Sequence, residues 1–238
     1  IAYIINHAED RVIILDASLQ ALFEPVVPLL HTVEHILVVG EQGDGALPGD
    51  IATSSYETLL ADSPEEFDWP ELDETSAAAI CYTSGTTGNP KGVVYSHRTT
   101  FVHSMASRAS DTFGISEHDR ILLLPPMFHA NSWGLPYSGW FSGSDFIMPG
   151  PHLQPEGIKS MVRSERPTIT AMVPTILGDL LRASDEEGLD MSSFRMLVCG
   201  GSAVAPALID AAREKWGVPV LQGWGMTETS PLCALSHP

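Results

Sequence analysis

The chain has 238 residues, of which 44% are hydrophobic, and it carries 12 Lys and Arg against 30 Asp and Glu, a formal net charge of -18. This length and composition allow one or two globular domains with a sizeable core. A protein that binds duplex nucleic acid needs clustered positive charges, and the only lysines here are Lys91, Lys159 and Lys215, so we exclude a nucleic-acid partner. No apolar run approaches the roughly 20 residues of a transmembrane helix.

Short apolar runs that favour strands recur along the chain, with helical patterns between many of them. The runs are 12–15, 36–39, 77–83, 121–124, 145–148, 169–173, 195–199 and 218–221. Two helical faces are formed by Ile158, Met161 and Val162 and by Leu208, Ala212 and Trp216. Because the strand runs are continuously apolar, they predict an α/β fold with layered, largely parallel sheets buried under helices on both faces.

Residues 41–74 are rich in Gly, Pro, Ser and acidic residues, which predicts an exposed connection with one short helix near 56–60. We therefore predict a domain boundary here, between a partial N-terminal subdomain at 1–75 and a core domain at 76–238. The chain begins at Ile1 without an initiator Met and without the pattern of a signal peptide, and we interpret it as part of something longer. Cys81, Cys199 and Cys233 are odd in number and widely spaced, which favours reduced thiols and a cytoplasmic protein.

The most informative segment follows the predicted strand at 77–83. Residues 83–92 read Thr-Ser-Gly-Thr-Thr-Gly-Asn-Pro-Lys-Gly and lead into a β-like run at 93–95. Glycines and small hydroxyl residues let backbone N–H groups approach a polyphosphate, and Lys91 adds a mobile positive charge. This is not a Walker A loop, because Pro90 stands where that loop requires a glycine. The alternative interpretation is a solvated hairpin turn, which uses the same residue types.

Three segments together resemble one family. Residues 83–92 are similar to the signature of the adenylate-forming superfamily of acyl-CoA synthetases, luciferases and peptide-synthetase adenylation domains. Residues 200–203, Gly-Gly-Ser-Ala, resemble its adenosine-site segment, and residues 223–228, Gly-Trp-Gly-Met-Thr-Glu, resemble its aromatic-Gly-x-Thr-Glu motif. Residues 125–137 and 148–153 narrow the resemblance to the medium- and long-chain fatty acyl-CoA synthetase branch, which includes methylmercaptopropionate-CoA ligases.

The resemblance spans essentially the whole chain but matches only the middle of such an enzyme. Family members continue past the Thr-Glu motif to a ribose-binding Asp, a hinge Arg and a mobile C-terminal domain with a catalytic Lys, and none of these precedes Pro238. The resemblance implies that 76–238 is the nucleotide- and acyl-binding core of a large N-terminal domain, with the mobile C-terminal domain absent. We expect the isolated fragment to be inactive or nearly so.

The resemblance also implies roles for individual residues. Glu228 would hold Mg²⁺, a cation that prefers oxygen ligands, and Thr227 would donate to the α-phosphate. His129 would lie near the substrate carboxylate, Trp133 would gate the acyl tunnel, and Trp224 would stack on adenine. The wider nucleotide-binding set comprises Thr83, Ser84, Gly85, Thr86, Thr87, Gly88, Lys91, Gly200, Gly201, Ser202, Gly223, Trp224, Gly225 and Met226.

Each of these residues also has an ordinary structural interpretation. Thr227 and Glu228 fit a helix N-cap with a first-turn acid, and paired glycines are common in strand-to-helix turns. A lone His is usually structural, and Trp133 fits an ordinary core position. Four further candidates for the tunnel lining are also ordinary core residue types: Phe128, Tyr137, Trp140 and Met172. No charged residue falls between Pro125 and Ser144, which suits an apolar acyl chain.

We predict a fragment of an ATP-dependent fatty acid-CoA ligase, an acid–thiol ligase that uses ATP and Mg²⁺, with CoA as co-substrate. The carboxylate and ATP would give acyl-adenylate and pyrophosphate, and CoA would then displace AMP. Alternatives are a methylmercaptopropionate-CoA ligase, another acyl-adenylating enzyme, or an inactive nucleotide-binding fragment. Homodimers are common among relatives, so a second copy is a candidate partner.

Overall fold

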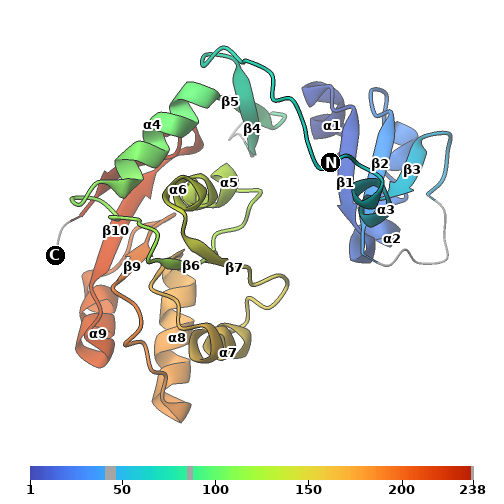
Figure 1. The fold of residues 1–238 in the computed structure, drawn as a ribbon. Helices are drawn as coiled ribbons and strands as arrows, with labels where there is room; N and C mark the ends of the chain where they lie inside the picture. Colours follow the sequence, from blue (N-terminus) through green and yellow to red (C-terminus); the bar gives the residue numbers. More distant parts are fainter. Residues whose placement is uncertain (41–46, 85–87, 237–238) are drawn as a thin grey trace. The chain divides into compact units, whose positions relative to one another are not determined.

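The structure, a computed structural model, describes residues 1–40, 47–84 and 88–236. It divides into two compact units (Figure 1). Unit 1 comprises Ile1–Leu72 and Ser84–Gly92, and unit 2 comprises Asp73–Thr83 and Val93–Pro238.

Unit 1 is built around a three-stranded parallel sheet in the order β1-β2-β3. Its elements are α1 (Ala2–Ala8), β1 (Val12–Asp16), the 3₁₀ turn η1 (Ala17–Leu19), α2 (Gln20–Phe23), the 3₁₀ turn η2 (Val27–Leu29), β2 (His35–Val39), β3 (Ala52–Ser55) and α3 (Tyr56–Ala61). Ile36 and Val38 on β2 are fully buried in the core of this unit. Val12 and Ile14 on β1 are 53% and 63% exposed, so burial on both faces, expected from the sequence, does not hold for β1.

The segment expected to be an exposed connection contains more structure than its composition indicated. Its short helix is confirmed as α3, and Ser55 caps it by accepting a 3.4 Å hydrogen bond from the Thr58 N–H. The strand β3 was not expected, because its sequence Ala-Thr-Ser-Ser is small and polar. It forms by parallel pairing along β2, from His35 opposite Ala52 to Val38 opposite Ser55.

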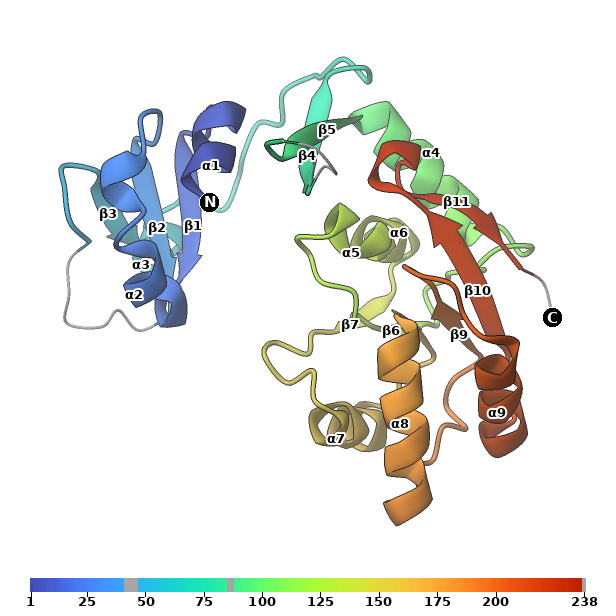
Figure 2. The ribbon, with the colours of Figure 1, turned by 180° about the vertical axis from the view of Figure 1, so that it is seen from behind.

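Unit 2 contains a six-stranded sheet in the order β11-β10-β9-β8-β6-β7 (Figure 2). It also contains the two-stranded pair β4-β5, except for Lys91 and Gly92 at the start of β5, which belong to unit 1. Its strands are β4 (Ala77–Thr83), β5 (Lys91–Ser96), β6 (Arg120–Leu122), β7 (Asp145–Ile147), β8 (Ile169–Met172), β9 (Met196–Cys199), β10 (Val220–Gly225) and β11 (Leu232–Leu235). Its helical elements are α4 (His97–Arg108), α5 (Ala130–Trp133), α6 (Leu135–Ser142), α7 (Pro155–Glu165), α8 (Pro174–Glu187), α9 (Pro206–Trp216) and the 3₁₀ turn η3 (Thr227–Thr229). The strands from β6 to β10 are mutually parallel, and β11 is antiparallel to β10.

Helices cover both faces of the six-stranded sheet, which confirms the predicted fold class. Alternate strand residues enter two different cores: Leu122 and Met172 pack with residues of α7, α8 and α9, whereas Ile121 and Ala171 pack with Leu135 of α6. Figures 1 and 2 show α7, α8 and α9 on one side of the sheet and α4 and α6 on the other. All four residues of β8 are buried, including the polar Thr170, whose hydroxyl donates to the Leu122 carbonyl oxygen at 2.7 Å.

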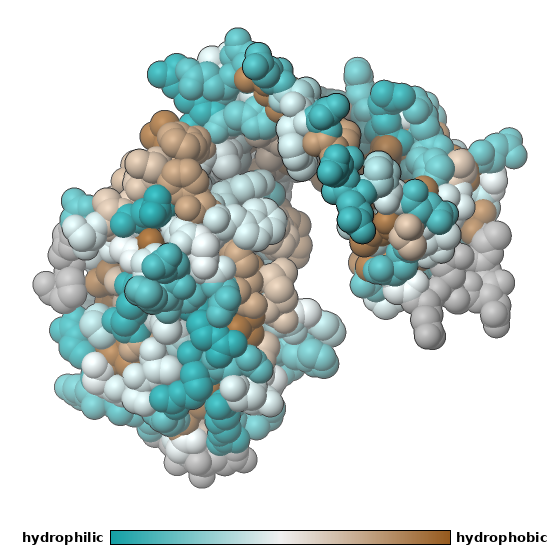
Figure 3. All heavy atoms as spheres, viewed as in Figure 1, coloured by the Kyte–Doolittle hydropathy of each residue, from teal (hydrophilic) through white to brown (hydrophobic). Residues whose placement is uncertain are grey.

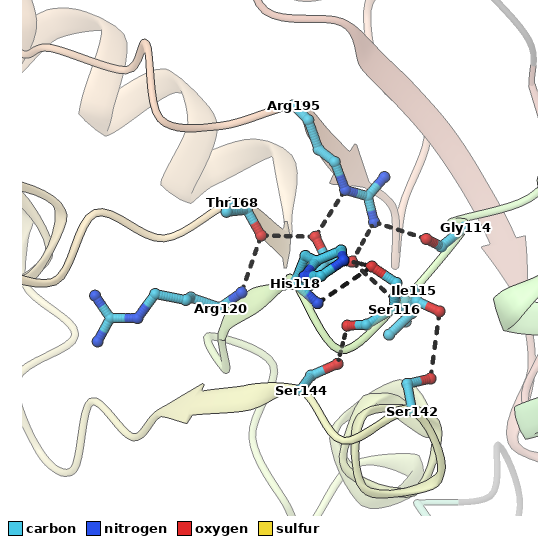
Figure 4. Close-up of polar contacts among 10 residues, drawn as sticks. Gly114, Ile115, Ser116, His118, Arg120, Ser142, Ser144, Thr168 and Arg195 are labelled. Carbon is cyan, nitrogen blue, oxygen red and sulfur yellow. Dashed lines mark hydrogen bonds and ion pairs between the residues drawn. The ribbon is translucent and has the colours of Figure 1, made fainter.

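A buried carboxylate joins the amino ends of the parallel strands. Asp119, which precedes β6, is 2% exposed and pairs with Arg195, which precedes β9, at 2.7 and 3.0 Å. The hydroxyl of Thr168, which precedes β8, donates to Asp119 Oδ1 at 2.7 Å, and the Ser116 N–H donates to Oδ2 at 2.9 Å. Figure 4 shows Arg195, Thr168 and Ser116 converging from separate segments. This cluster therefore stabilises the sheet at the amino ends of its strands, opposite the carboxyl ends.

Hydrophobic residues reach the surface over α4 (Figure 3). Phe101, Val102 and Met105 on this helix are 54%, 57% and 47% exposed. Among the residues that the structure describes, every helix falls short of the length and apolar character that a membrane span requires.

Candidate functional site

The strand order of unit 2 creates a topological switch point. The chain leaves β6 toward β7 on one side, and β8, β9 and β10 follow in turn on the other side of β6. In open α/β sheets, ligands bind outside the carboxyl ends of the strands at such a point. Three segments singled out from the sequence lie at these carboxyl ends: residues 125–137 come after β6, residues 200–203 follow β9, and residues 223–228 begin in β10 and continue past its end.

The segment after β6 ends in a left-handed turn. Residues Ala130 to Trp133 have φ values of 48°, 50°, 54° and 57°, so the element labelled α5 winds in the opposite sense to an α-helix. Each such non-glycine residue costs about 1–2 kcal/mol, so the turn requires support from its surroundings. The Ser132 hydroxyl donates to the Pro125 carbonyl oxygen at 2.7 Å, and the Cys81 thiol donates to Asn131 Oδ1 at 3.3 Å. The turn presents Trp133 in a half-buried position.

The paired glycines after β9 bring the predicted segments into contact. A Cβ on Gly201 would stand 3.4 Å from Trp133 Cζ2 and 3.2 Å from Val173 Cγ1, the residue that follows β8. A Cβ on Gly200 would stand 2.5 Å from the Gly223 carbonyl oxygen on β10. Gly201 also has φ 78°, which favours glycine. The glycines therefore lie on the strand-to-helix connection from β9 to α9 and also place its backbone against Trp133 and the Thr-Glu motif segment.

The Thr-Glu motif forms the turn of the β10–β11 hairpin, where Glu228 lies in the first turn of η3 as the structural alternative expected, but Met226 rather than Thr227 is the N-cap residue. Thr227 is 7% exposed, whereas Glu228 is exposed. The Met226 N–H donates to the Pro231 carbonyl oxygen at 3.1 Å and closes the turn. A Cβ on Gly225 would collide with the same carbonyl oxygen, so the hairpin requires glycine there. Glu228 is thus an exposed residue in a turn whose backbone is closed by this hydrogen bond.

Trp224 and Met226 flank this turn on the exposed side of the hairpin, at 52% and 45% exposure. Trp224 pairs with Ala234 on β11, and the ladder shifts register between Trp224 and Gly225. An indole that is half exposed next to a nucleotide motif offers a flat surface on which a purine can stack.

The phosphate motif begins at the end of β4 and ends at the start of β5, so the strand predicted after it is confirmed. Thr83 is half-buried, and Ser84, Gly88 and Lys91 are exposed. Gly88 has φ 92°, a conformation that favours glycine. Gly85, Thr86 and Thr87 lie outside the described residues.

The remaining predicted residues lie in different surroundings. His129 is exposed, and its backbone N–H donates to the Pro126 carbonyl oxygen at 3.0 Å. Ser202, which follows the paired glycines, is also exposed. Phe128 and Trp140 are 86% and 69% exposed, so they are not core residues. Met172 is 1% exposed and packs in the core beneath α7, α8 and α9.

Two residues that the sequence did not single out contact the Thr-Glu turn. The hydroxyl of Tyr95, on β5, donates to the Thr227 carbonyl oxygen at 2.6 Å. His103, on α4, accepts from the Leu232 N–H at 3.4 Å through Nε2. No local pattern could have identified them, because both contacts join residues that are far apart in the sequence.

The residues of the turn fit a divalent cation. Carboxylate oxygens are the ligands that Mg²⁺ prefers, and Mg²⁺ commonly takes only one or two protein carboxylates together with substrate phosphates. Glu228 is exposed, and its negative charge contributes to raising the pKa of the nearby Tyr95, after the larger effects of burial and of Cys81. The turn therefore offers one accessible carboxylate of the required type.

Comparison with known proteins identifies the family of this chain. The family model described as AMP-binding enzyme matches residues 1–238. The chain is 42% identical over 238 residues to a 3-methylmercaptopropionyl-CoA ligase of Ruegeria pomeroyi, covering 100% of the chain and 44% of the relative. It is 43% identical over 232 residues to a long-chain-fatty-acid–CoA ligase of Thermus thermophilus, covering 98% of the chain and 41% of the relative.

Among solved structures, an anthranilate CoA ligase in complex with anthranoyl-AMP superposes with a TM-score of 0.88 at 26% identity. The match covers 100% of this chain and 45% of that structure. The chain therefore belongs to the AMP-binding enzyme family. It spans less than half the length of these relatives.

Proposed function

We propose that the whole protein is an ATP-dependent acyl-CoA ligase that activates a medium- or long-chain fatty acid. In the first step a carboxylate oxygen attacks the α-phosphorus of ATP, which forms acyl-adenylate and releases pyrophosphate. In the second step the sulfur of CoA attacks the acyl carbonyl carbon, which forms the thioester and releases AMP. Residues 76–238 contain the nucleotide- and acyl-binding core of this enzyme.

One observation carries the proposal: the segments after β6, β9 and β10 meet at the carboxyl edge of the sheet. A Cβ on Gly201 would stand 3.4 Å from Trp133 Cζ2, and a Cβ on Gly200 would stand 2.5 Å from the Gly223 carbonyl oxygen. This is the edge at which an open α/β sheet binds its ligand. The contacts bring together a candidate acyl residue, an adenosine-site segment and a candidate metal and phosphate turn.

The charge that develops in the first step explains the residue types of the phosphate motif. Negative charge accumulates on the departing pyrophosphate, so donors and a cation aimed at it stabilise the transition state more than the ground state. We assign this role to Thr83, Ser84, Gly88 and Lys91, together with Gly85, Thr86 and Thr87. Glu228 would hold Mg²⁺, which supplies charge neutralisation at the phosphate oxygens. Thr227 would donate to the α-phosphate.

The adenine and the acid are assigned to the two sides of the paired glycines. Trp224 is half exposed and offers an aromatic face to the base, with Gly200, Gly201 and Ser202 as the neighbouring backbone. On the other side, Trp133 would control entry of the acyl chain, and His129 would orient the carboxylate. The uncharged segment from Pro125 to Ser144 suits an apolar chain.

The full-length protein tests the proposal when it is incubated with ATP, Mg²⁺, CoA and one acid at a time, and thioester and AMP are quantified by mass spectrometry. The panel holds acetate, octanoate, palmitate and 3-methylmercaptopropionate. We expect thioester with octanoate or palmitate in preference to the others. Preference for 3-methylmercaptopropionate would instead support the function named for the Ruegeria relative, and no thioester with any acid would contradict the proposal.

Two further points belong to this proposal. A cytoplasmic location is supported by Cys81, Cys199 and Cys233, all of which are free thiols. A homodimer is supported by the resemblance alone, since homodimers are common among relatives.

A further inference from the structure

The turn that contains Thr227 and Glu228 accepts a hydrogen bond from a side chain outside the β10–β11 hairpin. Tyr95 on β5 is 4% exposed, and its hydroxyl donates a 2.6 Å hydrogen bond to the Thr227 carbonyl oxygen. Thr227 is 7% exposed, so water has little access to either end of this bond. A buried carbonyl that loses its donor in such a place stays without a partner unless the backbone moves. The hydroxyl of Tyr95 therefore helps to fix the main chain at Thr227.

The protonation state of Tyr95 suits this role. Burial raises the pKa of its hydroxyl, and the nearby Cys81 and Glu228 raise it further. The hydroxyl therefore keeps its proton and remains a donor at neutral pH.

A second side chain contacts the other end of the same turn. His103 on α4 accepts from the Leu232 N–H through Nε2 at 3.4 Å. Burial lowers the pKa of His103 to about 4, so the imidazole is neutral at pH 7 and one ring nitrogen can accept. The same ring covers Gly134, where a Cβ would stand 2.7 Å from His103 Cε1. His103 thus touches both the end of the Thr-Glu turn and the residue that follows Trp133.

Tyr95 and His103 come from one continuous part of the chain, because α4 begins directly after β5. Their partners, Thr227 and Leu232, bracket Glu228 in the sequence. The exposed carboxylate therefore sits between two anchored backbone positions. Preorganisation of this kind matters for a metal or phosphate ligand, because a group that is already in place loses little freedom when its ligand binds.

We propose that Tyr95 and His103 are positioning residues that hold the Thr227–Glu228 turn in the geometry that binds Mg²⁺ and ATP. The proposal rests on the proposed function, since it assigns the two side chains a part in that reaction. Neither side chain touches a reacting atom. The occupant of the turn is a nucleoside triphosphate with its divalent cation.

The first test uses Tyr95→Phe in the full-length protein, which removes the hydroxyl and keeps the ring. We expect the Kd for ATP in the presence of Mg²⁺, measured by calorimetry, to rise about tenfold, as for the loss of one buried hydrogen bond. We also expect acyl-adenylate formation to require more Mg²⁺ for half-maximal rate. Tyr3→Phe removes a hydroxyl from unit 1 and is the matched control, with wild-type affinity expected.

A double-mutant cycle separates positioning from general stabilisation. If Tyr95 acts through Glu228, the loss caused by Tyr95→Phe is largely absent in a Glu228→Gln background. Full additivity of the two losses in ATP affinity, or a lowered melting temperature with unchanged affinity and Mg²⁺ requirement, would overturn the proposal for Tyr95.

His103 is tested by two replacements. His103→Gln offers an amide oxygen that can accept from the Leu232 N–H, whereas His103→Leu offers none. We expect Gln to retain more of the wild-type ATP affinity than Leu does. Equal affinities of both variants and the wild type would overturn the assignment of His103. If His103→Leu does not fold, the ATP affinity of His103→Gln is measured with and without Glu228→Gln, and the same double-mutant cycle then decides whether His103 acts through Glu228.

The two proposals fail in different ways. If the wild-type protein forms no adenylate with any acid but binds ATP with Mg²⁺, the ligase function is wrong while the positioning role is still decided by the affinities. If the wild type is an active ligase and Tyr95→Phe and both His103 variants match it in affinity and Mg²⁺ requirement, the positioning role is wrong.

Discussion

Gly200 lies directly against the carbonyl oxygen of Gly223, and a Cβ on Gly200 would stand 2.5 Å from that oxygen. Gly200 follows β9 and Gly223 lies on the neighbouring parallel strand β10. The obstacle is the backbone of Gly223, so a side chain at Gly200 cannot be accommodated by rotating a neighbouring side chain. The close approach joins the paired-glycine segment to the Thr-Glu hairpin through main-chain atoms alone.

Gly200→Ala is therefore expected to displace the ends of β9 and β10. Overpacking of this kind costs about 1–3 kcal/mol of unfolding free energy, and we expect a loss of ATP affinity in addition. Denaturant unfolding and ATP calorimetry measure the two effects.

Gly178→Ala is the matched control. Gly178 lies in α8, where the nearest atom to a new Cβ is Arg182 Nη1 at 3.6 Å. Because alanine is a better helix former than glycine by roughly 0.5–1 kcal/mol, this variant should equal or exceed wild-type stability. Equal stability and affinity of Gly200→Ala and wild type would show that the close approach has no consequence.

The strands of the large sheet could be predicted well from the sequence, and the reason is burial. The mainly apolar sequence of β8, with Thr170 as its one polar residue, forms a strand that is buried on every residue. In contrast, β11 was not predicted, although its short sequence Leu-Cys-Ala-Leu is apolar, and it lies at the edge of the sheet. Its formation depends on pairing with β10, which no local pattern encodes.

Acid should destabilise unit 2 through Asp119. Burial alone would raise the pKa of this carboxyl group, but hydrogen bonds from Arg195, Thr168 and Ser116 outweigh it and lower the pKa below the ordinary value. A lowered folded-state pKa stabilises the fold fully above the unfolded pKa of about 3.9, and this contribution is lost as the pH falls through the folded pKa. We expect the unfolding free energy to decline in that range.

Asp119→Asn removes the charge that Arg195 and its neighbours surround. We expect a loss of about 3 kcal/mol at pH 7, together with a shallower decline of stability below pH 4. Asp145→Asn, at an exposed residue 3.7 Å from Arg120, should change stability by less than about 1 kcal/mol. The measurement is urea unfolding from pH 3 to pH 7, and parallel pH profiles for wild type and Asp119→Asn would contradict the assignment.

Lys91→Ala should impair the adenylation step. A charge-assisted hydrogen bond contributes about 1.5–3 kcal/mol, so we expect kcat/KM for ATP to fall about 10- to 100-fold. Lys215→Ala on α9 removes the same charge and should keep wild-type kinetics. Normal adenylation with a selective loss of thioester formation would refute the phosphate role of Lys91.

Trp133→Ala should change the preference among acids of different chain length. The indole is half-buried, belongs to a left-handed turn, and lies 3.4 Å from the position that a Cβ on Gly201 would take, so its removal opens space beside the paired glycines. We expect the ratio of kcat/KM values for palmitate and octanoate to change by about tenfold, against no change for the exposed Trp69→Ala. An unaltered chain-length profile with lowered stability would make Trp133 a core residue.

The candidate site was predictable only as far as its motifs. The segments of Gly200, Trp133 and Glu228 could be named from the sequence, and the structure brings the first two segments together through Gly201. The left-handed turn at Ala130–Trp133 could not, because it contains no glycine until Gly134 and is held by distant partners such as Cys81. Tyr95 and His103 lay outside every motif for the same reason: their contacts are tertiary.

We propose that ATP and an acid bind at the carboxyl ends of the strands of the six-stranded sheet and are joined there. Acid-dependent exchange of labelled pyrophosphate into ATP by the full-length protein measures this step alone, without CoA. We predict exchange only when a fatty acid is present, and its loss in Glu228→Gln. Absence of exchange with every acid, or exchange that Glu228→Gln leaves unchanged across a Mg²⁺ titration, would contradict the account.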